Sequence, residues 1–490
     1  MALINVSGLT FSYPGSYDNI FENVSFQIDT SWKLGFCGRN GRGKTTFLNL
    51  LMRKFEYSGA INTNTLFSYF PFEVAASSKN TLQVIEEIAP DCLLWQIEKE
   101  LSTMEVSLSV LERPFKTLSG GEKTKVLLAG LFLRENNFLL IDEPTNHLDT
   151  RGREIVAKYL KSKTGFILVS HDRDFLDEIV DHILSINKSN IEIQSGNFSS
   201  WYHNKELCDN FEIDENKRLK KDIKRLHETA KEKAAWSDKI EASKIGEHVF
   251  DRGRVGHLAA KMMKRSKAIE KRQHKAIEEK STLLKNIETT DNLKIHPLKH
   301  HNNRLIEMEN VSLFYGDNVV ANNINFTLTY GERLVIYGGN GSGKSSLIKL
   351  ITGDSPPQAH GKINIASNLI VSYVQQDTHF LSGNLTDYAH DKQIDESLFK
   401  AILRKLDFSR VQFEKDISGF SSGQKKKVLI ARSLCEKAHV YIWDEPLNYI
   451  DILSRIQIEE LLDKFKPTMI FVEHDRAFCR KIASRAVNLL

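Results

Sequence analysis

Short, continuous runs of apolar residues recur along the chain and predict buried β-strands. The runs "FLLID" (138–142) and "VYIWD" (440–444) lack polar alternation, which is typical of strands covered on both faces of a parallel sheet. "GFILVSH" (165–171) and "TMIFVEH" (468–474) are runs of the same kind, and each ends in a histidine. "KLGFCG" (33–38) and "RLVIYGG" (333–339) lead through glycine-rich loops into helical patterns. This order of elements predicts an α/β fold.

The apolar pattern between these strand-rich regions is helical instead. Apolar residues recur there at intervals of three or four at Leu219, Ile223, Leu226, Ala230 and Ala234, and at intervals of about seven at Met262, Ile269, Ala276 and Leu284. Both patterns are interrupted by "SKIGEHVFDRGRVG" (243–256), which holds three glycines. We therefore expect a long antiparallel α-helical hairpin with its tip at about 243–257. Helices of 30–40 residues would reach roughly 45–60 Å.

The strand-rich regions repeat each other about 300 residues apart. "GRNGRGKTT" (38–46) recurs as "GGNGSGKSS" (338–346), and "LSGGEKTKVLLA" (118–129) recurs as "FSSGQKKKVLIA" (420–431). The interval from Ser119 to Glu143 is 24 residues, and so is the interval from Ser421 to Glu445. The chain is therefore predicted to hold two copies of one α/β domain, at 1–202 and 304–490, joined by a linker at 203–303.

Charge is concentrated in the predicted linker. Residues 211–290 hold 21 Lys or Arg against 14 Asp or Glu, whereas the whole chain has a net charge of only +4. From Arg252 to Lys275 there are nine basic residues and one acid. Faces made only for solubility usually mix signs, so this segment indicates a polyanionic partner such as RNA. A solvated spacer is the alternative.

Composition is that of a globular protein without a membrane segment or a signal peptide. No run of about 18 apolar residues occurs, and "MALINVSGLTFSY" has no basic start and no long apolar stretch. The five cysteines include no CxxC pair, which fits a reducing compartment and gives no metal site. We expect a cytoplasmic protein.

Each copy carries the pattern G-x-x-x-x-G-K-[ST], at 38–45 and 338–345. The glycines let backbone N–H groups turn toward phosphate oxygens, the lysine supplies a point charge, and the hydroxyl serves Mg²⁺. The predicted ATP-binding residues of these loops are Gly38, Asn40, Gly41, Gly43, Lys44, Thr45 and Thr46, and Gly338, Asn340, Gly341, Gly343, Lys344, Ser345 and Ser346.

Acidic residues end the two "FLLID"-type strands. Asp142 and Asp444 are costly there unless paired, and Mg²⁺ is the natural partner. Glu143 and Glu445 follow them and are placed to act as general bases on the attacking water. His171 and His474, some 28–29 residues further on, are expected to sense the γ-phosphate.

The short motifs "LSGGE" and "FSSGQ", set between phosphate loop and acidic strand, resemble the signature of ATP-binding-cassette ATPases. In that family two domains dimerise head to tail, so the resemblance places Ser119, Gly120 and Gly121 against the ATP on Lys344. Ser421 and Gly423 then face the ATP on Lys44. Tyr13 and Tyr315 match the aromatic that stacks on adenine, with core packing as the alternative. The resemblance implies a monomer whose two cassettes form the sandwich within one chain.

Two departures from this family fall in one composite site. The family has a Gln that contacts Mg²⁺ and the water, which the second copy keeps as Gln376 in "VSYVQQD", whereas the first copy has Phe72 in "FSYFPFEV". The second signature also has Ser422 in place of a Gly. Both changes map to the ATP on Lys44. We therefore expect a slow or regulatory Lys44 site and a more competent Lys344 site.

Two cassettes, no membrane domain and a charged helical linker resemble the ABC-F group of translational ATPases, over essentially the whole chain. "GRNGRGKTT", "YIWDEPLNY" and "MKRSK" are similar to its Lsa/Vga-type antibiotic-resistance branch. The resemblance implies ATP-dependent binding in the E site of the 70S ribosome, with the linker reaching 23S rRNA and the P-site tRNA. Lincosamides, streptogramin A compounds and pleuromutilins would be displaced. The predicted tip residues are Lys244, His248, Phe250, Arg252, Arg254, Lys261, Lys264, Arg265 and Lys267.

Other functions share parts of this pattern. A housekeeping ABC-F translation factor would carry every motif, but the inserted arm of such factors is missing, since only 75 residues separate Lys44 from Ser119. A transporter ATPase would have no use for a basic rod. A DNA-structural ATPase would need a far longer coiled coil or a zinc motif.

Overall fold

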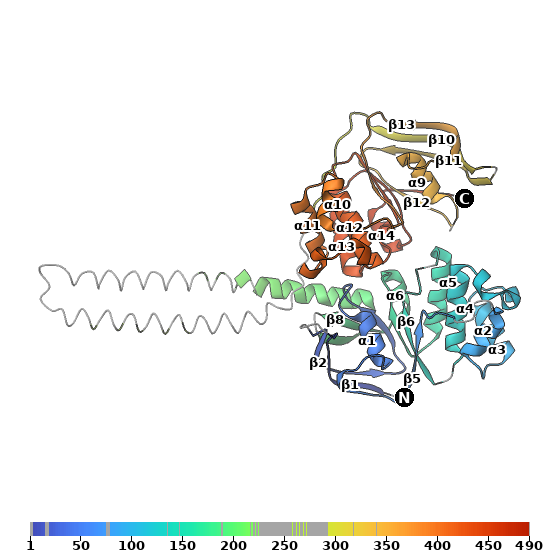
Figure 1. Ribbon diagram of the computed structural model, residues 1–490, viewed down its shortest axis with the longest axis vertical. Coiled ribbons are helices and arrows are strands. Elements are labelled where there is room, and N and C mark those ends of the chain that lie inside the picture. The colour runs from blue at the N-terminus through green and yellow to red at the C-terminus, as the bar shows by residue number, and fades with distance from the viewer. Residues whose placement is uncertain are drawn as a thin grey trace, which may run out of the picture. The chain divides into compact units, whose positions relative to one another are not determined.

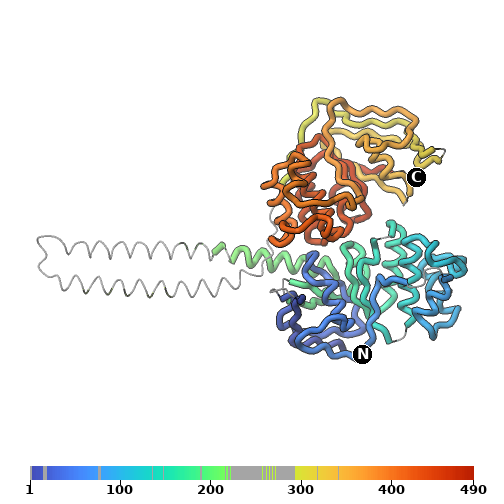
Figure 2. The backbone as a smooth tube through the Cα atoms, viewed as in Figure 1, coloured from blue at the N-terminus to red at the C-terminus, as the bar shows by residue number. Residues whose placement is uncertain are grey.

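The structure, a computed structural model, describes most of the chain outside the linker. The described residues are 3–14, 19–74, 79–134, 136–146, 148–187, 190–215, 293–316, 318–339 and 341–489, with single positions between 217 and 271. They divide into two compact units, one formed by Met1–Ser199 with Thr290–Leu490 and the other by Ser200–Thr289. The first unit holds both sequence repeats, which follow each other along the chain from blue to green and from yellow to red (Figures 1 and 2).

The first repeat is built on two sheets. A six-stranded sheet has the order β5-β6-β7-β3-β8-β9, and a three-stranded antiparallel sheet has the order β2-β1-β4. The strands are β1 Leu3–Phe11, β2 Phe21–Asp29, β3 Lys33–Cys37, β4 Ser58–Asn62, β5 Leu66–Phe70, β6 Asn137–Asp142, β7 Phe166–Val169, β8 His182–Asn187 and β9 Asn190–Ser195. The helices are α1 Lys44–Leu51, α2 Thr81–Ile88, α3 Leu94–Thr103, α4 Gly120–Phe132, α5 Thr150–Ser162 and α6 Arg173–Ile179, with short 3₁₀ turns at Leu108–Glu112 and Phe115–Thr117.

The second repeat has the same plan. Its larger sheet has the order β14-β15-β16-β12-β17, which matches β5-β6-β7-β3-β8 strand for strand, and its smaller sheet has the order β11-β10-β13. The strands are β10 Arg304–Tyr315, β11 Asn318–Thr329, β12 Arg333–Tyr337, β13 Gln358–Ile365, β14 Val371–Val374, β15 Val440–Asp444, β16 Met469–Val472 and β17 Arg485–Asn488. The helices are α9 Lys344–Thr352, α10 Leu385–Asp391, α11 Glu396–Lys405, α12 Ser422–Cys435, α13 Ile452–Phe465 and α14 Arg476–Ile482, with 3₁₀ turns at Arg410–Glu414 and Ile417–Gly419.

The parallel register of the strands brings the acidic residues at the ends of β6 and β15 next to the ends of β7 and β16. Asp142, the last residue of β6, pairs with Val169 at the end of β7, and Asp444 of β15 pairs with Val472 of β16. The buried, continuously apolar strands predicted from the sequence are these four. Because parallel strands end at one edge of a sheet, the acids and the histidines that follow β7 and β16 share that edge.

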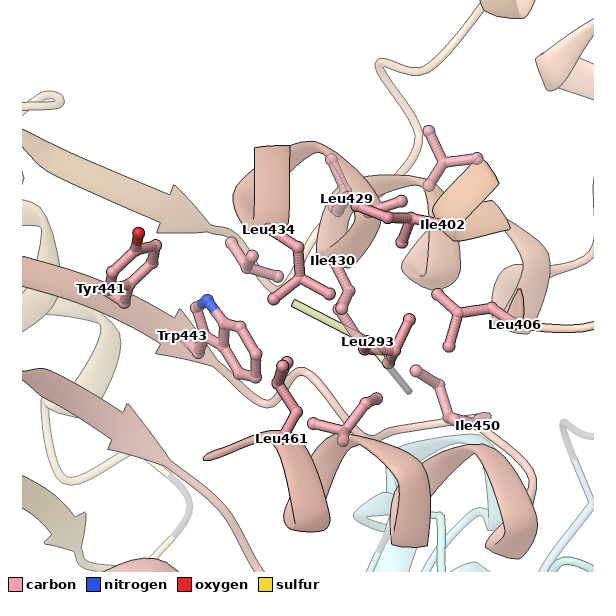
Figure 3. Packing of buried hydrophobic residues seen from close by; sticks show 14 of the residues in the cluster. Leu293, Ile402, Leu406, Leu429, Ile430, Leu434, Tyr441, Trp443, Ile450 and Leu461 are labelled. Atoms are coloured by element: carbon pink, nitrogen blue, oxygen red, sulfur yellow. The ribbon is translucent and has the colours of Figure 1, made fainter. Parts of the chain in front are cut away.

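The chain that enters the second repeat is anchored in its core. Leu293 and Ile295 are buried in a cluster with Leu406, Ile450 and Trp443. Figure 3 shows Leu293 among the side chains of this cluster, near Ile430 and Ile450. The predicted linker boundary at 303 stays a prediction, but the last residues before β10 belong to the packing of the second repeat.

Of the predicted hairpin, the structure describes a helix over 198–215 and helical backbone at Lys217, Arg218, Lys221 and Lys224 and at His257, Lys261, Lys264, Ala268 and Lys271. The hairpin tip lies outside the described residues. Among the residues that are described, no helix combines the length and the apolar character that crossing a membrane requires.

Candidate nucleotide sites

Each glycine-rich loop lies between a central strand and the helix that follows it, β3 and α1 or β12 and α9. The backbone is left-handed at the same places in both loops, with φ of 82° at Gly41, 96° at Gly43, 82° at Gly341 and 87° at Gly343. A Cβ on Gly43 would lie 2.6 Å from the Ile20 side chain, so a larger residue has neither the conformation nor the space. The helix N-terminus behind each loop favours an anion.

Both loop lysines are buried cations held by backbone carbonyls. Lys44 Nζ donates to Gly38 O at 2.6 Å, and Lys344 Nζ donates to Gly338 O and Gly339 O, both at 2.8 Å. Burial lowers the pKa of both lysines, against the opposing effect of nearby carboxylates. The carbonyls carry no net negative charge that could compensate the buried ammonium groups, whereas a phosphate does. The loops therefore fit a nucleotide.

The strand-end aspartates have the environment expected of Mg²⁺ ligands. Asp142 accepts hydrogen bonds from Tyr69 Oη at 2.9 Å and Thr45 Oγ1 at 3.3 Å. Asp444 is 1% exposed, is hydrogen-bonded to Ser345, and has an Oδ1 without a hydrogen-bond partner in the described residues. Burial raises the pKa of both carboxyls. A buried, unpartnered carboxylate oxygen is costly, and a hard cation with oxygen ligands removes that cost.

Each predicted general base faces its histidine. His171 Nε2 lies 3.4 Å from Glu143 Oε1, and His474 Nε2 lies 3.5 Å from Glu445 Oε1. Both glutamates have left-handed backbones, with φ of 51° and 47°, a strained conformation that is concentrated at functional sites. Gln376 Nε2 donates to Glu445 Oε2 at 2.8 Å, so the structure brings this predicted Mg²⁺ ligand to the base itself.

The two glutamates differ in their electrostatics. Burial raises the pKa of Glu143 to about 8. Burial also acts to raise the pKa of Glu445, but the hydrogen bond from His474, the charges of His474 and Lys426, and the hydrogen bond from Gln376 outweigh it and lower that pKa. Burial lowers the pKa of His171 well below its ordinary value.

Lys426 is a site residue that sequence reasoning missed. It is 2% exposed, and its Nζ donates to Gln375 O at 3.1 Å and to Asp444 O at 3.4 Å. The signature motifs align it with Thr124, so the first repeat has no cation at this place. The substitution of Lys for Thr was visible in the sequence, but a lysine on a helix is usually a solvated one. Its burial beside the Asp444 carbonyl follows only from the packing of α12 against the sheet at β14 and the end of β15.

The Lys44 loop and the second signature line one cleft of about 530 Å³, together with Asp142, Glu143 and His171. Ser421, Ser422 and Gly423 are its second-repeat residues from α12 and its cap. Asn40 Nδ2 donates to Tyr449 O at 2.8 Å, and a Cβ on Gly423 would lie 2.3 Å from that same oxygen. Only glycine therefore fits where the second repeat closes on the first loop.

Near the Lys344 loop, two adjoining hollows of about 330 and 310 Å³ share His474. The first is lined by Gly338 and Asp149, and the second by Gly120, Gln376 and Glu445. The structure therefore brings the first signature to the second base. Ser119 caps α4 by accepting from Glu122 N at 3.2 Å, and Gly121 lies in the first turn of that helix.

The predicted adenine-stacking tyrosines are both partly exposed, Tyr13 by 40% and Tyr315 by 47%. Tyr13 lines the Lys44 cleft, where its hydroxyl lies 2.9 Å from Thr46 Oγ1 and its ring meets Phe11 edge-on. Tyr315 ends β10, and Ser346 lies in the first turn of α9. The stacking role of both tyrosines stays a prediction.

The two departures from the cassette pattern differ in position. Ser422 lines the Lys44 cleft, as the sequence predicted. Phe72 lines a different hollow, of about 460 Å³, with Val84, Ile88 and Arg134. In the described residues, no side-chain amide donates a hydrogen bond to Glu143 as Gln376 does to Glu445.

Several predicted residues lie outside the described residues: Asn340, Lys244, His248, Phe250, Arg252, Arg254, Arg265 and Lys267. Lys261 and Lys264 are described, and both are helical and exposed.

Comparison with known proteins covers nearly the whole chain. A family model described as ABC transporter matches residues 21–146 and 321–448. The ribosome protection protein VmlR of Bacillus subtilis (strain 168) is 30% identical over 480 residues, which span 96% of this chain and 84% of that protein. The erythromycin resistance ATP-binding protein MsrA of Staphylococcus epidermidis is 30% identical over 500 residues, 96% of this chain and 94% of that protein.

Other similar proteins carry no resistance name. The ATP-binding protein Uup of Buchnera aphidicola (strain APS) is 28% identical over 99% of this chain and 80% of that protein. Among solved structures, one titled RNase-L Inhibitor has a TM-score of 0.63 at 17% identity, over 98% of this chain and 87% of that chain. At that identity the likeness shows the fold alone.

Proposed function

The chain belongs to the ABC-F group of the ATP-binding-cassette family, and on that premise we propose that it is a ribosome-protection ATPase. It is an ATPase that uses ATP with Mg²⁺. In the proposal it binds the E site of the 70S ribosome with ATP, in the cytoplasm. Its linker tip reaches 23S rRNA and the P-site tRNA and displaces lincosamides, streptogramin A compounds or pleuromutilins, and ATP hydrolysis releases it.

The observation that carries this proposal is the likeness to VmlR across 96% of the chain, because it spans both cassettes and the segment between them. That segment holds the nine basic residues of 252–275, which suit phosphate contacts on RNA. The composite clefts give the ATP dependence a physical basis. Since each cleft takes residues from both cassettes, nucleotide binding favours their closure.

In the proposed hydrolysis, Lys44 and Lys344 bind the phosphates. Asp142 with Thr45, and Asp444 with Ser345, would hold Mg²⁺, which would supply positive charge to the phosphate oxygens. Glu445 accepts the proton of the attacking water, and His474, 3.5 Å away, positions that carboxylate.

We further infer that the two clefts work at unequal rates. The Lys344 cleft is supported as the faster one by Gln376, which donates to Glu445, and by the buried charge of Lys426. Phe72 and Thr124 occupy the equivalent sequence positions in the first cassette and provide neither group.

Binding to ribosomes is the first test. The Glu143→Gln/Glu445→Gln double variant should cosediment with 70S ribosomes in the presence of ATP, because it can bind ATP but lacks both bases. A chain that remains in the supernatant with ATP would contradict ribosome binding.

Drug protection is the second test. Cells that express the chain should grow at higher concentrations of a lincosamide or pleuromutilin, and Phe250→Ala should remove this gain while ribosome binding persists. Phe211→Ala is the matched control, since Phe211 is 72% exposed on the helix over 198–215 and lies outside the tip. Unchanged susceptibility in all strains would favour a housekeeping ABC-F factor, which the similarity to Uup also supports.

A further inference from the structure

Three consecutive large apolar residues of the first cassette point into solvent. Leu93, Leu94 and Trp95 are 58%, 52% and 58% exposed. We refer to these three residues as the apolar triad. Leu93 is the N-cap residue of helix α3, and Leu94 and Trp95 are its first two residues. Ile97 and Leu101 supply the buried face of the helix. Because the triad is more than half exposed, it adds little to the core, and contiguous exposed apolar groups mark interaction surfaces.

The second cassette supplies an internal comparison. Its helix α11 has the same length as α3, and Phe399 and Leu403 are buried at the positions that correspond to Ile97 and Leu101. At the positions of the triad, however, α11 has Asp395, Glu396 and Ser397. The helix packs in the same way in both cassettes, so its packing does not require apolar residues at these three positions.

The apolar triad also forgoes a stabilising cap. The Asp395 carboxylate accepts from Leu398 N at 2.9 Å and caps α11, whereas Leu93 at the same place offers no side-chain acceptor. Ser, Thr, Asp and Asn are the preferred residues here, and leaving the cap out weakens a helix. Helix α3 is therefore less stable than it would be with an aspartate at its cap, which is the residue that the second cassette has there. A binding role of the apolar triad explains why this stability is lost.

The charge around the triad selects the kind of partner. Residues 81–105 hold six acids and the single base Lys99, and three of the acids, Glu87, Glu100 and Glu105, form ion pairs with Lys79, Lys163 and Arg151 from outside this stretch. In the part of the chain that the structure describes, no ion pair involves Glu86, Asp91 or Glu98, and Glu98 lies one helical turn from Leu94. An acidic rim repels RNA and anionic lipid, and it also repels a second copy of the same surface. It attracts a protein that presents Lys or Arg around an apolar pocket.

We propose that Leu93, Leu94 and Trp95 form a docking surface for a basic protein, with Trp95 as the central anchor. Large aromatic side chains of this kind dominate the binding energy of protein interfaces. With the proposed function as its premise, the partner is a basic ribosomal protein. The chain would then hold the ribosome at two chemically opposite places: a basic linker on RNA and an acidic, apolar cassette surface on protein.

The first experiment transplants the second cassette's residues into the first. The triple variant Leu93→Asp/Leu94→Glu/Trp95→Ser should keep its melting temperature or raise it, because Asp restores the cap, and should keep basal ATPase activity. Its affinity for 70S ribosomes with a non-hydrolysable ATP analogue should fall at least tenfold. Val411→Ser, which removes a side chain 60% exposed in the second cassette, is the control and should bind as the parent does. Undiminished binding by the triple variant would overturn the proposal.

The second experiment identifies what the surface touches. A photo-crosslinking amino acid at position 95 of the full chain, bound to 70S ribosomes, should attach to a basic ribosomal protein, and the same probe at position 397 should not. Attachment to rRNA or to another copy of the chain would refute the proposal. If the parent chain itself fails to cosediment with ribosomes, the proposed function is wrong and the ribosomal partner is wrong with it.

Discussion

Removing one general base at a time tests the inequality of the two ATP sites. The perturbations are Glu445→Gln and Glu143→Gln, which are equivalent by sequence position and change the same atoms. They differ in surroundings, because Gln376 donates to Glu445 at 2.8 Å and no such amide serves Glu143 in the described structure. We expect Glu445→Gln to remove most of the turnover and Glu143→Gln to remove little of it.

The size of the difference follows from the Gln376 contact. A hydrogen bond to a charged group contributes about 1.5–3 kcal/mol, which corresponds to about 10–150-fold in rate if it orients the base in the transition state. With sites that are otherwise alike, the Lys344 site then carries about nine-tenths or more of the total turnover. Glu445→Gln should leave at most about a tenth of the activity, and Gln376→Ala, which lowers the Lys344 site to the rate of the Lys44 site, should leave at most about a fifth.

Steady-state phosphate release by the purified full chain, at saturating ATP and Mg²⁺, measures these rates. Binding of a fluorescent ATP analogue and the melting temperature serve as controls that each variant is folded and holds nucleotide. Equal losses in the two glutamate variants would refute the reasoning, and so would a Gln376→Ala variant with full turnover.

The remaining predictions concern stability. Lys427 Nζ lies 2.7 Å from Asp451 Oδ2 and both side chains are buried, so Asp451→Asn should destabilise the second cassette by about 3–5 kcal/mol in thermal unfolding. Asp149→Asn, at the equivalent position of the first cassette, keeps a helix-capping side chain and should cost less than about 0.5 kcal/mol. Burial acts to raise the pKa of Asp451, but the Lys427 ammonium and the Ser454 N–H outweigh it and hold that pKa below its ordinary value. The pair therefore stabilises the fold above about pH 4, and parent and Asp451→Asn melting temperatures should converge as the pH falls below that value; a constant difference would contradict this. Leu293→Ala should cost about 2–5 kcal/mol, since Leu293 is 4% exposed, and the exposed Leu207→Ala should be nearly neutral.

Spacing along the chain was enough to predict the duplicated cassettes, whereas the composite nature of their sites was implied by the resemblance to ATP-binding-cassette ATPases. The phosphate loops and the acidic strand ends are local patterns. The glycines of the loops are needed for φ near 90°, and each acid directly follows an apolar strand, so both features can be recognised from neighbouring residues in the sequence. The placement of Ser422 on the Lys44 cleft followed from the head-to-tail arrangement that the cassette resemblance implied.

What only the tertiary structure decided is which side chains are buried and which are exposed. Lys426 reads as a surface lysine until α12 packs it against the backbone carbonyls of Gln375 and Asp444. Leu293 reads as the end of a linker until it enters the core of the second cassette. Leu93 and Trp95 are large apolar residues, yet they are exposed. Burial depends on contacts between distant segments, whereas motifs depend on adjacent residues. The sequence therefore determined the chemistry of the two ATP sites and the residue changes that predict their inequality. The fold decided which side chains surround each base and which apolar residues lie on the surface.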